Sequence, residues 1–166
     1  MSSRLETGTT TSAGIDRVWE VLVDWVGQAS WIPLTTLRVL TPQQTGLGVR
    51  IAALSGFWAG RLPVGLLDNF VVTGWSPPAD GHAELEILHL GPYFTGEGVF
   101  HLSTVAPSTG EAGTAAGGTR VRCVELVTVP GGALTNAVVG LTLPLMKLGF
   151  DQSLAQFAAV AEGRRR

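Results

Sequence analysis

The sequence predicts an α+β fold in which a curved antiparallel sheet of about seven strands wraps around a long C-terminal helix, with two short helices after the first strand. Apolar residues recur with a helical period after residue 12 and again after residue 132. Between these segments, short stretches rich in Val, Ile, Leu, Phe and Thr alternate with clusters of Gly and Pro. Because short turns join consecutive strands, we expect an antiparallel meander.

Composition favours one domain with more apolar surface than an ordinary core needs. We expect a single domain over residues 1–166, with a core at 9–161 and a basic tail at 162–166. Hydrophobic residues make up 45% of the chain and charged residues only 14%. The surplus is expected to line a cavity, to form a subunit interface, or both.

Charge and cysteine content exclude several classes of function. The net charge is −2, so no basic field is available for nucleic acid. Cys123 is the only cysteine, which excludes an internal disulfide and a cysteine-rich zinc site. The first eight residues lack a signal-peptide stretch, and the apolar region at 138–150 is too interrupted to span a membrane. We therefore expect a cytoplasmic protein without stable membrane insertion, metal or cofactor.

The individual elements follow from periodicity and turn chemistry. After a strand at 5–11, Ser12 is the predicted N-cap of an amphipathic helix, and a second helical turn ends at Pro33. The final helix is expected to reach Gly163, and Pro144 is expected to kink or break it. The Gly-rich stretch at 110–118 is predicted to be a flexible hairpin loop. The remaining strands are expected at 35–41, 48–55, 65–75, 82–90, 94–104 and 119–129.

Several local motifs accompany this order of elements. Asp16-Arg17-Val18-Trp19 lies early in the first helix, Trp75-Ser76-Pro77-Pro78 follows a strand, and Gly96-Glu97-Gly98-Val99-Phe100 opens another. With this order, the sequence resembles the START/Bet v 1-like (SRPBCC) superfamily, including polyketide cyclase/dehydrase-like proteins. The resemblance implies a helix-grip fold that binds hydrophobic molecules such as lipids, polyketides or sterols. It does not imply a reaction, because only a minority of such proteins are enzymes.

Strand alternation places three ionisable residues on the apolar face: Asp68, His89 and Glu125. If the turn at 76–81 is centred, Asp68 pairs opposite His89 on the next strand. A turn at Gly91-Pro92 places His89 opposite Gly96, and Glu125 then lies across from Gly98. The two glycines leave a gap between His89 and Glu125 for a ligand group or for a direct contact. Buried carboxylates must be paired or used, so we expect this cluster to anchor a ligand or to satisfy itself.

The remaining candidates are apolar. Trp31 and Phe57 lie near the ends of elements, where they are expected either to gate a cavity or to pack at its rim. Trp19 is expected in the core and Trp75 at a turn. The full set of expected ligand-binding residues is Asp68, Phe70, Ile87, His89, Gly96, Gly98, Phe100, Glu125, Trp31, Phe57, Leu141 and Leu145.

Three functions are compatible with these observations. The first is a carrier or sensor of a hydrophobic small molecule, lipid- or polyketide-like. The second is a cyclase or dehydratase in which His89 acts as general acid/base, with Asp68 and Glu125 as partners. The third is an interaction module: Val139, Leu143 and Met146 make the last helix apolar nearly all round, which suggests a homodimer or a membrane contact.

Overall fold

The structure is a computed structural model that describes residues 2–59, 62–110, 113–115, 117–131 and 133–164, without the side chains of residues 2, 57–64, 108–116 and 132–146. Within these residues, seven strands form one antiparallel sheet in the order β1-β9-β6-β5-β4-β3-β2. The sheet strands are β1 (Ser2–Thr11), β2 (Thr35–Val39), β3 (Arg50–Ala59), β4 (Leu62–Ala79), β5 (His82–Pro92), β6 (Thr95–Val105) and β9 (Gly118–Thr128).

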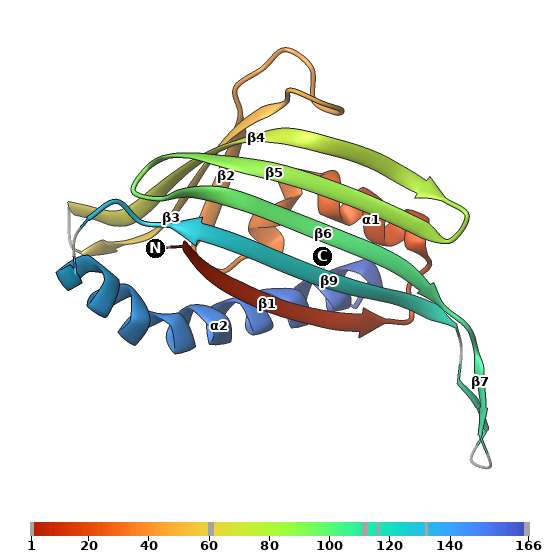
Figure 1. The fold of residues 1–166 in the computed structure, drawn as a ribbon. Coiled ribbons are helices and arrows are strands. Elements are labelled where there is room, and N and C mark those ends of the chain that lie inside the picture. The colour runs from red at the N-terminus through yellow and green to blue at the C-terminus, as the bar shows by residue number, and fades with distance from the viewer. Residues whose placement is uncertain (1, 60–61, 111–112, 116, 132, 165–166) are drawn as a thin grey trace.

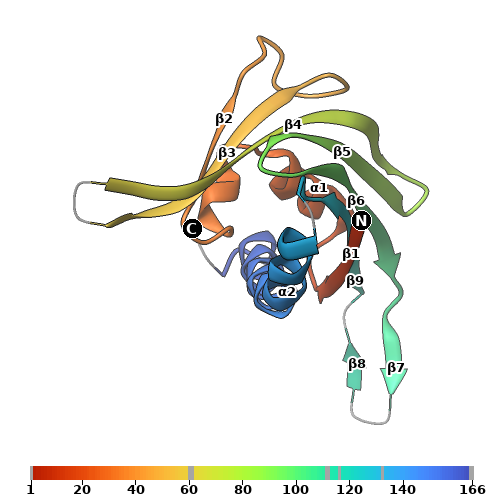
Figure 2. The same ribbon diagram turned by 60° about the vertical axis from the view of Figure 1, so that its left-hand side comes forward.

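The sheet curves around the long C-terminal helix α2 (Ala133–Ala161), as Figures 1 and 2 show. Helix α1 (Ile15–Val23) and the 3-10 turn η1 (Gly27–Ser30) lie between β1 and β2 and cover the same concave face. This is the predicted α+β helix-grip arrangement, with two short helices after the first strand. Helix α2 continues through Pro144 as one element, so the predicted break into two helices does not occur.

Helix α1 packs its apolar stripe against the sheet, since Val18, Trp19, Val21 and Leu22 are all buried. The predicted cap at Ser12 is wrong: the helix begins at Ile15, with Gly14 at the N-cap position. Ser12 instead binds the Glu162 carboxylate: its backbone N–H donates at 2.9 Å and its hydroxyl donates at 3.1 Å. These bonds hold the end of α2 against the end of β1.

Aromatic pairs join the helical layer to the rest of the core. Trp19 packs edge-on against Trp75, with ring centroids 5.0 Å apart. The predicted turn position of Trp75 is wrong, because Trp75 lies within β4, where it pairs with Leu85. Trp31 meets Phe157 of α2 in the same way at 5.0 Å. Both members of the second pair are buried, so the segment after η1 and the C-terminal half of α2 share one core.

The register of the β4–β5 hairpin differs from the predicted register. Its turn is Asp80-Gly81, with positive φ at both residues (49° and 78°), whereas Pro77 and Pro78 belong to β4. At the tip of the hairpin, Ala79 pairs with His82. Two irregularities in β4 then shift the register, so that Phe70 pairs with His89. The predicted pairing of Asp68 with His89 is therefore wrong by two residues, and Asp68 pairs with Pro92.

The chain between β6 and β9 is not purely loop. Two short strands, β7 (Ser108–Gly110) and β8 (Gly113–Ala115), pair with each other and project away from the sheet. The predicted loop at 110–118 therefore includes part of a short two-stranded ladder, which begins at Ser108, before the predicted loop.

Candidate functional site

A cavity of about 610 Å³ lies between the concave face of the sheet, η1 and the C-terminal half of α2. Its described lining is mostly apolar and comes from elements far apart in sequence. Among the expected residues, the lining includes Trp31, Asp68, Phe70, Ile87, His89, Phe100 and Glu125. Gly96 and Gly98 lie under the cluster rather than in the described lining, and the side chains of Phe57, Leu141 and Leu145 lie outside the described residues.

The three ionisable residues meet on the sheet wall of this cavity. His89 Nδ1 lies 2.9 Å from Asp68 Oδ2, and His89 Nε2 lies 3.1 Å from Glu125 Oε2. His89 is 7% exposed and Glu125 is 5% exposed. We call these three residues the inner cluster. Strand alternation predicted all three residues of the inner cluster. Asp68 is not directly opposite His89, however: Phe70 is, and Asp68 reaches His89 diagonally from two residues earlier in β4.

The contact between His89 and Glu125 crosses an intervening strand, because β6 separates β5 from β9. His89 pairs with Gly96, and Gly98 pairs with Glu125, as the sequence predicted. A Cβ atom at Gly98 would lie 2.8 Å from both carboxylate oxygens of Glu125. The missing side chain therefore gives the two long side chains room to meet over β6, and a direct contact occupies the predicted gap.

The cluster is enclosed by aromatic rings and by a thiol. The Phe94 ring lies 5.1 Å from the His89 ring, and Phe70 lies 6.0 Å from it on another side. Cys123 donates a weak hydrogen bond of 3.7 Å to Glu125 Oε1. Burial raises the pKa of the Cys123 thiol, and the neighbouring Glu125 charge adds to this effect. Cys123 is thus a neutral donor to the cluster rather than a reactive nucleophile.

The electrostatic balance favours a charged imidazole. Burial alone would lower the pKa of His89, but the hydrogen bonds and charges of Asp68 and Glu125 outweigh it and raise the pKa to about 9. At neutral pH, His89 therefore holds both protons and donates from both ring nitrogens. The two carboxylates accept these bonds, so each member of the cluster has a partner.

Sequence reasoning missed several lining residues. Trp25 packs against Phe70 at 6.0 Å and donates its indole N–H to the Gln44 carbonyl. The predicted turn at Gly91-Pro92 is wrong, because both residues belong to β5 and pair with β4, and Phe94 lies in the two-residue connection between β5 and β6. Its ring centroid is 5.1 Å from that of His89. The helical spacing of Trp25 after Leu22 was a usable signal, since it continues the buried stripe of α1. Nothing local marks Phe94, whose position depends on how this connection folds back over the sheet.

Known structures with the same fold support this description of the architecture. A protein from Thermus thermophilus is 16% identical, with 98% of this chain and 99% of that chain covered and a TM-score of 0.67. The Zhui aromatase/cyclase from Streptomyces sp. R1128 is also 16% identical, with coverage of 99% and 96% and a TM-score of 0.66. A Thalictrum norcoclaurine synthase, 12% identical, covers 99% and 96% with a TM-score of 0.61.

The chain therefore has the helix-grip fold that the sequence predicted, and these solved structures share that fold. No protein-family profile and no curated protein sequence matches it. Among the described helices, none combines the length and hydropathy needed to cross a bilayer. The described residues also contain no group of three or more His, Cys, Asp or Glu side chains placed to hold a metal ion.

The raised pKa of His89 predicts how stability depends on pH. The folded-state pKa of about 9 exceeds the ordinary value of 6.5, so the stabilisation is complete below pH 6.5 and is lost as pH rises through 9. Chemical denaturation should show the free energy of unfolding falling over this range, by up to about 3 kcal/mol. The His89→Gln variant should lack this fall. An equal slope in both proteins would contradict the assignment of a charged, doubly bonded His89.

Proposed function

We propose that the protein binds a small hydrophobic molecule, lipid- or polyketide-like, in the cavity and acts as its carrier or sensor. The observation that carries this proposal is the cavity of about 610 Å³, which lies within the range of ligand sites and has a mostly apolar lining. Apolar walls supply affinity, and a small number of placed polar groups orient the ligand. The inner cluster is the polar group best placed for that second role.

The architecture explains why such a cavity persists. The sheet is curved and α2 crosses its concave face (Figure 2), where it contacts β1 and α1, and the cavity is lined by sheet residues together with residues 149, 150 and 152–154 of α2. Trp25 packs against Phe70 and Trp31 packs against Phe157, and a wall that is already packed lowers the ordering cost of binding. The proposed role as a carrier or sensor requires only this binding step.

Filling the cavity from one strand position tests the proposal. Ala53 of β3 lines the cavity, and Ala52 beside it faces the opposite side of the sheet. The Ala53→Phe variant should bind the neutral apolar dye N-phenyl-1-naphthylamine about tenfold more weakly, because the new ring occupies ligand space. The Ala52→Phe variant should bind the dye like the parent protein.

Dye fluorescence titration measures both affinities, and circular dichroism confirms that both variants are folded. Equal dye affinity in folded Ala53→Phe and Ala52→Phe proteins would contradict binding in this cavity. Native mass spectrometry of the purified parent protein would then identify any molecule that co-purifies with it.

An enzyme of cyclase or dehydratase type is the second candidate function, and the hydrogen-bonded inner cluster favours it. Two solved structures of the same fold are enzymes, an aromatase/cyclase and a norcoclaurine synthase. As a doubly protonated ring, His89 has a proton to give as a general acid once a substrate group takes the place of one carboxylate, while the other carboxylate holds the ring.

Turnover of a co-purified ligand would separate an enzyme from a carrier. If His89 is a general acid, His89→Gln should lower the rate by about 10²-fold or more while ligand binding is retained. Mass spectrometry of the ligand before and after incubation measures the rate. A variant with full turnover would remove His89 from the reaction.

A homodimer remains a prediction from the apolar last helix. The side chains that suggested it, Val139, Leu143 and Met146, lie outside the described residues.

A further inference from the structure

The polar groups that the inner cluster offers to a ligand are hydrogen-bond acceptors. Both nitrogens of His89 already donate, one to Asp68 and one to Glu125. Each carboxylate oxygen accepts two hydrogen bonds, so Asp68 and Glu125 keep free acceptor positions after binding His89. The Asp68 side chain is 17% exposed against 6% for Glu125, which makes Asp68 the more accessible of the two.

Several donors elsewhere on the inner wall are occupied or covered. The Ser153 hydroxyl donates to the Gly149 carbonyl at 2.9 Å, inside α2. Thr35 and Ser55 share a hydrogen bond of 2.7 Å, and Thr35 also bonds the Pro33 carbonyl. The Trp31 indole N–H has no partner, but neighbouring atoms cover it completely. Ser3, Tyr93 and Gln152 also line the cavity and carry donor groups, but none of the three is a cation.

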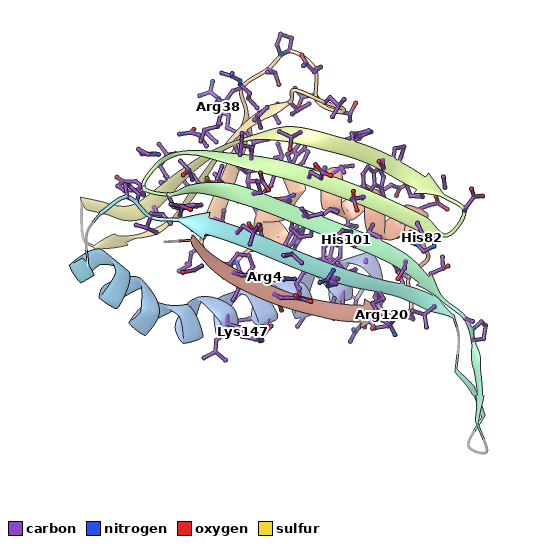
Figure 3. All side chains as sticks on the ribbon, in the orientation of Figure 1. Arg4, Arg38, His82, His101, Arg120 and Lys147 are labelled. Carbon is purple, nitrogen blue, oxygen red and sulfur yellow. The ribbon has the colours of Figure 1, made fainter. Side chains whose placement is uncertain are left out.

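Charge leads to the same conclusion. An imidazolium between two carboxylates has a formal net charge of −1, and this charge lies against apolar walls where screening is weak. None of the described lining residues is Lys or Arg. The labelled Arg and Lys side chains are absent from the described lining and lie on the outer face of the sheet or on the exposed side of α2 (Figure 3). Arg122 is paired there with Glu6, and Lys147 is paired with Asp151.

We propose that the ligand of this cavity carries a hydrogen-bond-donating head group, with an ammonium favoured over a hydroxyl, and that the head docks on Asp68. Carboxylate-headed molecules such as fatty acids are disfavoured, because they would bring a second negative charge against the inner cluster and no Lys or Arg is among the described lining residues. This inference rests on the proposed function, since it assigns the ligand class of the same cavity. An ammonium group neutralises the excess charge of the cluster, and an alcohol supplies only the hydrogen bond.

Two matched series of ligands test the proposal on the unmodified protein. One series has a naphthyl body: 2-(1-naphthyl)ethylamine, 2-(1-naphthyl)ethanol and 1-naphthylacetic acid. The other has an alkyl body: dodecylamine, dodecanol and dodecanoic acid, all used below their micellar concentrations. Within each series the apolar surface is nearly constant, so affinity differences report the head group.

Calorimetry or ligand-observed NMR at pH 7 should rank the amine first, the alcohol second and the acid last in the series that binds. The amine should bind at least about tenfold more tightly than the acid. An acid that binds as tightly as its amine would overturn the inference and leave the proposed function standing. Failure of all six compounds, together with the neutral dye, would overturn the proposed function itself.

A charge-removing variant locates the head group. Asp68→Asn should reduce the amine-to-acid ratio of affinities by about tenfold, because it removes one negative charge and one acceptor oxygen. Glu97→Gln is the matched control: Glu97 is exposed and faces outward from β6, so the same loss of charge should leave the ratio unchanged. An unchanged ratio in Asp68→Asn, or an equal fall in both variants, would contradict docking at Asp68.

Discussion

The hydrogen-bonded contact of His89 with two carboxylates is the interaction on which the interior of this protein depends. A carboxylate without a partner on an apolar wall costs several kcal/mol, roughly, or takes up a proton. Asp68 and Glu125 avoid this cost because one imidazole serves both, at 2.9 and 3.1 Å. The three residues therefore act as one unit, and removal of His89 would leave both carboxylates exposed to this penalty.

Backbone geometry makes this unit possible. The side chains of β5 and β9 meet across β6 because Gly98 has no side chain to fill the space between them. Glycine is required at position 96 for a different reason: its φ is 151°, and a Cβ there would lie 1.8 Å from the Leu126 carbonyl oxygen. At Gly96, β6 approaches β9 so closely that only glycine is tolerated. The polar contact and the sheet curvature thus share one strand.

Much of the site could be predicted from the sequence because a strand alternates its faces strictly. The predicted pairing of Asp68 with His89 was wrong by two residues, yet an even shift returns every side chain to the same face. The three residues of the inner cluster were therefore predicted correctly, even though the predicted register between β4 and β5 was wrong. The error arose at Pro77 and Pro78, because prolines are typical of turns, whereas these two lie in β4. Both lie beyond the end of the pairing between β4 and β3, so the missing backbone N–H of proline removes no hydrogen bond to β3.

The size of the cavity and its aromatic boundary could not be predicted in the same way. Both depend on the curvature of the sheet and on how Trp25, Trp31 and Phe94 fold over it from segments without strand periodicity. Periodicity identifies the inner face, but it does not report whether opposing layers touch. That outcome is decided by three-dimensional packing between residues far apart in the chain, as Trp31 and Phe157 show.

A high-resolution crystal structure of protein purified without added ligand tests the central claim most directly. The account predicts a hollow between sheet and helix, with continuous non-protein electron density that reaches the Asp68 carboxylate. An interior filled by the protein's own side chains, or an imidazole of His89 turned out into bulk water, would contradict it.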